Sequence, residues 1–390
     1  MPFSAVSTLS QTYPFSLQKA GEIDTLNHCI LKVRNMAKLK DLRKNIDDID
    51  LKILKLLNSR AKIVLDIKEE KKDNRLKVYS PVREREILNR IEKLNTGPFP
   101  SDALIALYRE ILSTSRSLQQ PLKIAYLGPS ATFTHLAARK QFGSSAEYLP
   151  ENTIKAVFES VARDKTQYGV VPIENSTEGV INYTLDVFMD LDLNIASEIM
   201  LKITHNLMST TGRKHGIKKI YSHPQPIAQC RGWLEENYPG IPVIGSMSTA
   251  AAAKRVAKEP SSAAIASELA ADIYKLKFIE KGIEDYKNNY TRFLVIAKDS
   301  PGRTGKDKTT IMFSVKDRPG ALYSILKHFS KHKINLTKIE SRPSRRKAWE
   351  YIFFADMEGH IEDIKVKKAV DEVKGECLYL KVLGSYPSAE

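Results

Sequence analysis

The chain has 390 residues, which at about 100–200 residues per domain predicts two to four domains. Hydrophobic residues make up 42% and charged residues 27%, a balance typical of a globular protein that can bury real cores. No run approaches the roughly 20 apolar residues of a membrane-spanning helix. The net charge of +15 fits either nucleic-acid binding or attraction of small anionic substrates. No zinc-finger spacing or basic cluster interleaved with aromatics is present, which favours the small anions over nucleic acid.

The three cysteines are widely scattered. Cys29, Cys230 and Cys377 form neither a disulfide framework nor a metal-type pair. We therefore expect a reducing, cytoplasmic location and no metal.

Residues 1–36 differ from the rest of the chain. Residues 1–20 are rich in Ser and Thr, carry almost no charge and lack the basic start and apolar core of a signal peptide. Helical patterning begins just after Met36. We expect 1–36 to be a disordered N-terminal extension, with Met36 as an alternative start.

Residues 37–120 predict a helical domain. Apolar residues recur at steps of three, four and seven over 41–72, which indicates one long helix. Ser80 as N-cap and Pro81 at the first position begin a second helix that runs to about Leu94. A third helix follows over about 102–119. The first helix is too long to bury its apolar stripe within this domain, so we expect a dimer.

The pattern changes to α/β over 121–300. Short apolar strands at 123–127, 168–172, 217–221 and 241–244 each lead into a helical segment. This alternation predicts mainly parallel sheets, and the length allows two lobes.

The last domain, 301–390, follows a linker. Strands are expected at 309–315, 334–339, 349–355 and 377–383, with helices at 321–331 and 361–373. The order strand, helix, strand, strand, helix, strand is that of the ferredoxin-like fold.

Several cations of the helical domain lie where an amphipathic helix keeps apolar residues. Arg60 and Lys71 continue the apolar face of the first helix, whereas Arg43 is rotated from Arg60 by about 100° and points elsewhere, for example into a partner chain. Polar residues also share faces of the second and third helices: Ser80, Arg83 and Glu84, then Ser115 and Gln119. Buried cations need anionic partners, which predicts a small ligand with several negative groups. The alternative is Lys and Arg side chains whose stems cover apolar surface while their charges stay in water.

These residues carry a resemblance to a known family. Residues 41–120 resemble the all-helical class of chorismate mutases, through Leu42-Arg43, Arg60, Lys71, Pro81-Val82-Arg83-Glu84 and Ser115 to Gln119. The resemblance implies that Arg43 of one protomer and Arg60 of the other bind the two carboxylates of chorismate, with Arg83 and Ser115 assisting. It also implies that Lys71 and Gln119 donate hydrogen bonds to the ether oxygen and that Glu84 binds the ring hydroxyl. Ser80 stands where the family often has Asp. Such a rearrangement needs a folded substrate and well-placed donors but no nucleophile.

Five motifs mark the α/β domain, at 128–138, 171–179, 222–230, 248–252 and 289–293. Ser222 and Ser248 are expected N-caps, and His135 and His223 are expected in capping or core roles. Glu174-Asn175-Ser176 ends a buried strand, where α/β proteins place ligand contacts.

Together these motifs resemble prephenate dehydratases, with Ala131 replacing a Gly that the family usually carries. The resemblance implies that Thr291 donates a hydrogen bond to the leaving hydroxyl and that Arg292 is a carboxylate clamp. The other implied substrate-binding residues are Glu174, Asn175, Ser176, Ser222, Gln229, Thr249, Asn289 and Phe293. No metal or organic cofactor is implied.

Two motifs in the last domain, Gly320-Ala321-Leu322-Tyr323 and Glu340-Ser341-Arg342-Pro343, resemble the signatures of the amino-acid-binding ACT domain. The resemblance implies L-phenylalanine bound at an interface between two such domains. The alternative is a dimerisation domain without ligand.

Combined, the resemblances imply a cytoplasmic bifunctional enzyme of L-phenylalanine biosynthesis, a homodimer or larger, that converts chorismate to prephenate and then to phenylpyruvate under feedback inhibition by L-phenylalanine. Two alternatives stay open. One is a dehydratase that prefers arogenate. The other is a catalytically inert ligand-binding regulator, because two α/β lobes and a sensor resemble solute-binding architecture.

Overall fold

The structure is a computed structural model that describes residues 17–73, 78–344 and 350–389, with side chains described from residue 38 onward except 72–77. It divides into two compact units, residues 1–69 and 70–390. Helix α1 (Leu17–Asp73) begins well before the predicted start of the helical domain, and no proline interrupts it. The expectation of disorder therefore does not hold over 17–36, which are helical, while 1–16 lie outside the described residues.

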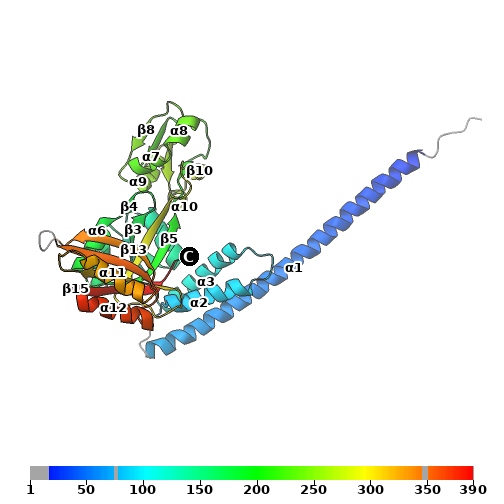
Figure 1. The fold of residues 1–390 in the computed structure, drawn as a ribbon. Helices are drawn as coiled ribbons and strands as arrows, with labels where there is room; N and C mark the ends of the chain where they lie inside the picture. Colours follow the sequence, from blue (N-terminus) through cyan, green and yellow to red (C-terminus); the bar gives the residue numbers. More distant parts are fainter. Residues whose placement is uncertain (1–16, 74–77, 345–349, 390) are drawn as a thin grey trace, which may run out of the picture. The chain divides into compact units, whose positions relative to one another are not determined.

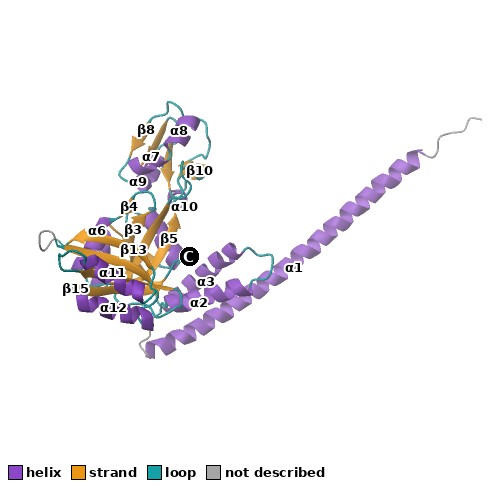
Figure 2. Cartoon of the chain, viewed as in Figure 1, coloured by secondary structure: helices purple, strands orange, loops and turns teal. Residues whose placement is uncertain are grey.

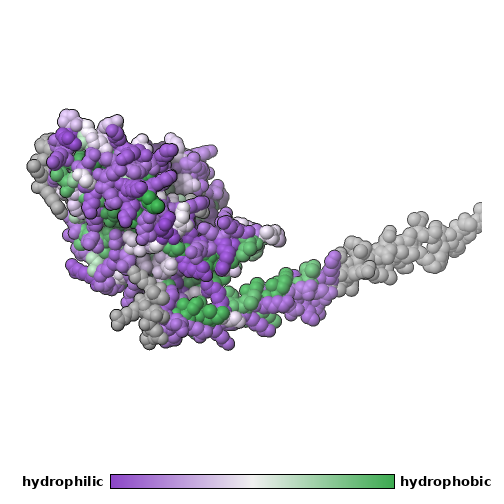
Figure 3. Space-filling view, turned by 60° about the horizontal axis from the view of Figure 1, so that its bottom comes forward, coloured by the Kyte–Doolittle hydropathy of each residue, from purple (hydrophilic) through white to green (hydrophobic). Residues whose placement is uncertain are grey.

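The first unit consists of most of α1, and an apolar row runs along it. Seven residues of the row are between 42% and 70% exposed: Leu42, Ile46, Ile49, Ile53, Leu56, Ile63 and Ile67. They form the green band along the helix in Figure 3. Within its own unit this helix has nothing to cover the row.

The second unit opens with two helices that match their predictions closely. Helix α2 spans Pro81–Leu94 and α3 spans Ser101–Gln119. Ser80 caps α2 by accepting a hydrogen bond from the Arg83 N–H at 3.3 Å. Tyr79, just before the cap, packs into the core of the next domain against Phe142, with ring centroids 5.4 Å apart.

The α/β region consists of two lobes, each with its own sheet (Figures 1 and 2). The first sheet has the order β2-β1-β3-β11-β5, with β4 paired to β3. Its elements are β1 (Lys123–Leu127), α4 (Phe133–Phe142), β2 (Glu147–Glu151), α5 (Ile154–Ala162), β3 (Tyr168–Asn175), β4 (Gly179–Val180), α6 (Asn182–Asp190), β5 (Asn194–Lys202) and β11 (Tyr290–Ala297).

The second sheet has the order β10-β6-β9-β7-β8. Its lobe comprises β6 (Asn206–Ser209), β7 (Lys219–Ser222), α7 (Pro224–Gln229), α8 (Arg231–Asn237), β8 (Val243–Gly245), α9 (Thr249–Val256), β9 (Ser262–Ala266), α10 (Glu268–Tyr274) and β10 (Lys277–Glu280). The chain crosses into this lobe after β5 and returns as β11.

The expectation of mainly parallel sheets is wrong, because both sheets are mixed. The strands at the crossing cause this. The returning strand β11 inserts between β3 and β5 and runs antiparallel to both. In the second sheet, β6 likewise runs antiparallel to β9 and β10, while β7 is parallel to β8 and β9.

The last domain has the predicted ferredoxin-like order, with an antiparallel sheet β13-β14-β12-β15. Its elements are β12 (Asp307–Ser314), α11 (Ala321–Lys331), β13 (Leu336–Pro343), β14 (Tyr351–Glu358), α12 (Ile364–Glu376) and β15 (Tyr379–Pro387). Helices α11 and α12 cover one face through Phe329 and Val370. The other face joins the core of the first lobe, where Phe354 and Leu383 cluster with Leu294. The two domains therefore share one hydrophobic core.

Among the described residues, every helix is too short or too polar to cross a membrane.

Candidate functional site

A cavity of about 300 Å³ lies between the two lobes of the α/β region. Both lobes contribute polar side chains to its wall. The principal lining residues are Thr132, Phe133, Asn175, Thr291 and Phe293 from the first lobe, and His205, His223, Gln229, Ser248 and Thr249 from the second, with Asn289 on the returning segment. Six of the predicted substrate-binding or catalytic residues therefore meet here: Asn175, Gln229, Thr249, Asn289, Thr291 and Phe293.

Two neighbouring strands place the central pair of the cavity. Thr291 at the start of β11 lies opposite Asn175 at the end of β3. The Asn175 Nδ2 donates to the Thr291 Oγ1 at 2.8 Å and to the Asn289 Oδ1 at 2.8 Å. The Asn175 Oδ1 accepts from the Thr177 and Glu178 backbone N–H groups at 3.0 and 3.1 Å. These donors fix which end of the amide faces Thr291.

This arrangement determines what the Thr291 hydroxyl can do. Its oxygen already accepts a hydrogen bond from Asn175, so its own proton is left to donate. Among the described residues no acceptor for that proton lies within hydrogen-bonding distance of the Thr291 Oγ1, which lines the cavity. The hydroxyl is therefore a donor directed at whatever fills the cavity.

A β-bulge makes the pairing of Asn175 with Thr291 possible. Pairing of β3 with β11 shifts register between Arg292 and Phe293, which lie opposite Glu174 and Pro172. The extra residue allows both Pro172 and Asn175 to line the cavity, whereas regular alternation would place them on opposite faces.

His205 belongs to the site although nothing in the sequence singled it out. Its Nε2 lies 2.7 Å from the Gln229 Oε1, an oxygen that also accepts from the Asn289 Nδ2 at 3.3 Å. Because that oxygen can only accept, His205 donates from Nε2, and its Nδ1 carries a lone pair. That atom is buried without a partner in the described part of the chain. Burial lowers the pKa of His205, which keeps the ring neutral. Its position at the crossing between lobes, just after a strand, is the only sequence signal for it.

Of the two serines expected to be N-caps, only one caps a helix. Ser248 does cap α9, accepting from the Ala251 N–H at 3.0 Å, and so places Thr249 in the first turn beside the cavity. The interpretation of Ser222 as an N-cap is wrong. Ser222 ends β7, is fully buried and donates to the Ile265 carbonyl at 2.7 Å, and His223 caps α7 instead. The cap falls one residue later because β7 pairs through Ser222.

Two further expectations concern His135 and Ser176. His135 has the predicted core role, stacked on Tyr126 at 4.5 Å, and burial lowers its pKa to about 4. Ser176 lies outside the cavity wall, where its Oγ accepts from the Tyr290 N–H at 2.9 Å and so joins the end of β3 to the start of β11.

Arg292 and Glu174 do not line the cavity, contrary to the prediction for both. Arg292 follows Thr291 on the strand and points to the opposite face, where it is 9% exposed. Its Nε lies 2.7 Å from the Glu198 Oε2 and its Nη1 2.6 Å from the Asp356 Oδ2. Glu174 pairs with Lys338 at 2.8 Å. Both residues thus face the ferredoxin-like domain rather than the cavity.

The predicted site residues of the helical domain are divided between the two units. In the first unit, Arg43 is exposed and Arg60 is partly buried on α1. In the second, the Lys71 Nζ donates to the Val78 carbonyl at 3.1 Å, and burial lowers its pKa against the opposing charge of Glu84. Arg83 is exposed and pairs with Glu86 at 2.9 Å.

Three residues near the end of α3 bear on ligand binding. Glu84 pairs with Arg116, a buried arginine that the sequence did not single out. The Ser115 Oγ donates to the Ile111 carbonyl at 2.6 Å. The Gln119 Oε1 is buried without a hydrogen-bond partner among the described residues. A buried amide oxygen normally has a hydrogen-bond partner, so this one has room for a donor that the structure does not contain.

The two motifs of the ferredoxin-like domain lie at one helix start and one sheet edge. Gly320 adopts φ +79 directly before α11, so Ala321 and Leu322 form its first turn. The second motif, 340–343, lies on β13, the edge strand of the sheet. Ser341 and Pro343 are exposed, whereas Arg342 pairs with Asp186 of the first lobe at 3.1 Å.

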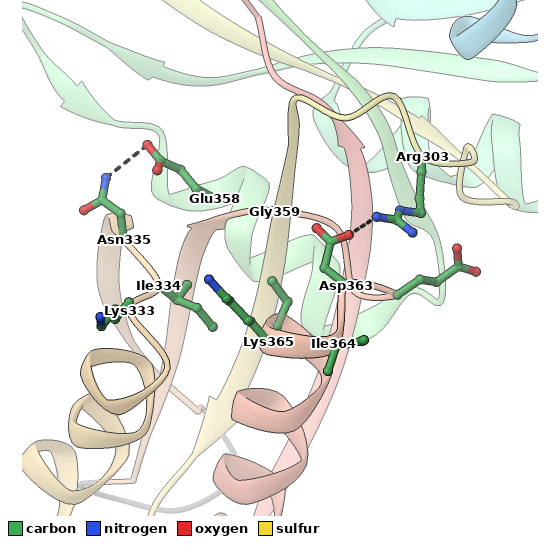
Figure 4. Close-up of a pocket in the computed structure, with 11 residues that line it drawn as sticks. Arg303, Lys333, Ile334, Asn335, Glu358, Gly359, Asp363, Ile364 and Lys365 are labelled. Carbon is green, nitrogen blue, oxygen red and sulfur yellow. Dashed lines mark hydrogen bonds and ion pairs between the residues drawn. The ribbon is translucent and has the colours of Figure 1, made fainter.

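A larger hollow, of about 410 Å³, lies elsewhere in the ferredoxin-like domain (Figure 4). Its wall includes Arg303 and Asp363, which pair with each other, and Asn335, which donates to Glu358 at 3.0 Å. None of the predicted site residues lines it. Because the predicted site residues gather in the cavity between the lobes instead, we assign the functional site to that cavity.

The fold and the cavity define a class of protein: a two-lobed α/β protein with a polar cavity between its lobes and a ferredoxin-like domain. Among the described residues, no group of three or more His, Cys, Asp or Glu side chains is arranged to hold a metal ion.

Comparison with known proteins identifies the family. Three family models match successive parts of the chain: chorismate mutase type II over residues 42–120, prephenate dehydratase over 124–301 and the ACT domain over 309–375. A bifunctional chorismate mutase/prephenate dehydratase from Aquifex aeolicus is 52% identical over 358 residues, covering 91% of this chain and 99% of the relative. The chain belongs to the family of bifunctional chorismate mutase/prephenate dehydratases.

Solved structures cover the part beyond the helical domain. A prephenate dehydratase from Arthrobacter aurescens in complex with L-Phe is 34% identical, with a TM-score of 0.63, and covers 68% of this chain and 90% of its own. GqqA, described as a novel type of quorum-quenching acylase, has the same TM-score of 0.63 at 27% identity and covers 68% of this chain and 98% of its own.

Proposed function

We propose that the cavity between the lobes converts prephenate to phenylpyruvate, with the Thr291 hydroxyl as the donor to the leaving ring hydroxyl. The observation that carries this proposal is the fixed hydrogen bond from Asn175, which leaves the Thr291 proton free to point into the cavity. In the reaction, the bond to the ring carboxylate and the bond to the ring hydroxyl both break, releasing CO2 and hydroxide as the ring becomes aromatic. Threonine is a weak acid, so its contribution is a positioned hydrogen bond to the departing oxygen rather than a free proton.

The carboxylates of prephenate need binding groups other than Arg292. The first turn of α9, which begins at Thr249 and is capped by Ser248, offers backbone N–H groups at the cavity wall. Asn289 and Gln229 add amide groups, with the neutral His205 holding Gln229 in place. This assignment uses polar neutral groups and a helix N-terminus, which suits an anion held without direct ion pairing.

The mutase step belongs to the helical domain. In this proposal, Arg43 and Arg60 bind the chorismate carboxylates, with Arg83 and Ser115 assisting, while Lys71 and Gln119 donate to the ether oxygen and Glu84 holds the ring hydroxyl. The Gln119 oxygen, which is buried without a partner in the part of the chain that the structure describes, and the lowered pKa of Lys71 support a ligand site at the end of α3. The exposed apolar row of α1 supports a homodimer, in which a second copy covers the row and contributes the other arginine.

We also propose that L-phenylalanine inhibits the enzyme through the ACT domain. The Arthrobacter relative was solved in complex with L-Phe. The exposed residues of 340–343, on an edge strand, suit a ligand site completed by a second ACT domain. Cys230 and Cys377, the two cysteines whose side chains the structure describes, are free thiols, in keeping with a cytoplasmic enzyme.

The experiment that tests the function is a coupled assay. Purified protein given chorismate should release phenylpyruvate, and L-phenylalanine should slow that release. Prephenate accumulation without phenylpyruvate would refute the dehydratase assignment, and a faster rate on arogenate than on prephenate would change its substrate. Ligand binding without any turnover would instead support the regulator alternative.

A further inference from the structure

The two residues next to the central pair of the cavity are charged and face the opposite side of the sheet. Thr291 and Asn175 lie opposite each other on β11 and β3, and the adjacent pair is Arg292 opposite Glu174. The first pair faces the cavity, and the second faces the ACT domain. Because consecutive residues of a strand point to opposite faces, a displacement of Arg292 can reach Thr291 through the backbone of β11.

The ACT domain presents a matching pair. Asp356 on β14 lies opposite Lys338 on β13. Asp356 pairs with Arg292 at 2.6 Å and Lys338 pairs with Glu174 at 2.8 Å. We call Arg292, Glu174, Asp356 and Lys338 the ion-pair cluster. Arg292 and Glu174 are neighbours on the sheet of the first lobe, and each pairs with a residue of opposite charge on the sheet of the ACT domain.

Three members of the ion-pair cluster are well buried, the Glu174 side chain is 37% exposed, and further hydrogen bonds hold the Arg292 half. Arg292 also donates to the Tyr386 hydroxyl at 3.0 Å, and Asp356 accepts from the Thr310 hydroxyl at 2.7 Å. The Lys338 side chain is 13% exposed. Ion pairs in such surroundings have one favourable geometry, so a shift on one side forces a shift on the other.

The strand that carries Lys338 also carries the predicted ligand motif 340–343. Because side chains alternate along a strand, Lys338, Glu340 and Arg342 share one face. Lys338 and Arg342 both pair with the first lobe, to Glu174 and Asp186. A ligand that contacts this motif therefore binds to the strand whose Lys338 and Arg342 form ion pairs with the first lobe.

We propose that the ion-pair cluster transmits the state of the ACT domain to the dehydratase cavity by setting the positions of Thr291 and Asn175. Arg292 and Glu174 are then positioning residues for dehydration, not substrate ligands. This inference rests on the proposed inhibition by L-phenylalanine.

The test compares two interdomain lysines. Lys338→Met removes one pair of the cluster. The matched control is Lys381→Met, which removes the pair between Lys381 and Asp192 at 2.7 Å, also between the two domains. Asp192 precedes the end of β5 that pairs with Ala297, at the other end of β11 from Thr291. Lys338→Arg keeps the charge and should retain wild-type behaviour. Asp356→Asn provides a second route to the same effect through Arg292.

Two quantities are measured on the full-length protein: L-phenylalanine binding by calorimetry, and kcat and KM for prephenate with and without saturating L-phenylalanine. In Lys338→Met and Asp356→Asn, L-phenylalanine should still bind, while the fold-inhibition of kcat should fall by about fivefold or more, a typical coupling magnitude. Lys381→Met and Lys338→Arg should match the wild type. Chorismate mutase activity reports whether each variant is folded.

The outcomes separate the two proposals. If the wild type is inhibited and both cluster variants are inhibited as strongly as Lys381→Met, the cluster does not couple the sites and only this inference is overturned. If the wild type binds no L-phenylalanine or is not inhibited by it, the proposed regulation itself is overturned, and the coupling with it.

Discussion

Replacing Thr291 with Val tests the proposed dehydratase chemistry most directly. The two side chains have nearly the same shape, so the change removes a hydroxyl and little packing. Thr291 is 8% exposed, and its oxygen accepts only from Asn175 among the described donors, at 2.8 Å. The variant therefore loses one donor aimed at the cavity, and Asn175 loses one of its acceptors.

The two losses differ in size. Removing one well-placed donor to a developing negative charge in a buried site typically costs about 3–4 kcal/mol of transition-state stabilisation, or about 100–1,000-fold in kcat. Asn175 retains the Asn289 Oδ1 at 2.8 Å and the Tyr290 carbonyl at 3.3 Å. The free energy of unfolding should therefore fall by only about 1 kcal/mol.

The assay follows phenylpyruvate formation from prephenate and, in the same preparation, prephenate formation from chorismate. Only the first rate should fall. Thr184→Val is the matched control, because it also removes one buried threonine hydroxyl, which donates to the Pro172 carbonyl at 2.6 Å. If Thr291→Val keeps kcat within about threefold of that control, the hydroxyl is not the donor that the reaction uses.

Three further predictions concern stability and assembly. Burial holds the pKa of His135 at about 4, below its value in the unfolded chain. The neutral ring therefore contributes its full stabilisation above about pH 6.5, and the free energy of unfolding declines by about 2 kcal/mol towards pH 5. His135→Leu should remove this part of the pH dependence, measured by unfolding in denaturant. Gly384→Ala should cost about 2–3 kcal/mol in the same measurement, because φ is +150 and the new Cβ would clash with the Ile195 carbonyl, whereas Gly375→Ala on α12 meets nothing within 4 Å and should be neutral. Leu56→Glu, at a position 70% exposed, should yield monomers in sedimentation and abolish mutase but not dehydratase activity; an unchanged dimer would contradict the role of the apolar row.

The likeness to GqqA shows why the site, and not the fold, carries the functional argument. A structure similar to 68% of this chain belongs to a protein described as an acylase. An acylase of the nucleophilic type needs a base beside its nucleophile. In this chain the Thr291 oxygen accepts a hydrogen bond from an amide donor, and among the described residues no basic side chain is hydrogen-bonded to it. This geometry suits hydrogen-bond donation better than nucleophilic attack.

The sequence by itself determined the elements and their order. Ser80-Pro81 marked the start of α2, Gly320 preceded α11, and the alternation of strands and helices separated the α/β region from the ferredoxin-like domain, because caps, turns and periodicity are local properties of the chain. The motif resemblances also collected most residues of the cavity. Local patterns could not supply the direction of side chains that depend on strand pairing across distant segments.

Only the tertiary structure decided which face each site residue uses. Arg292 was expected to bind a substrate carboxylate because a guanidinium suits that role, yet strand alternation turns it to the ACT domain. Regular alternation from Pro172, which lines the cavity, would turn Glu174 towards the cavity and Asn175 away from it. The bulge against β11 reverses these directions, so Glu174 faces Lys338 and Asn175 faces Thr291. A bulge and an interdomain ion pair both depend on partners more than 100 residues away, as the separations of 116 and 164 residues show. Such partners are brought together by the packing of the whole fold, which no local stretch of sequence specifies.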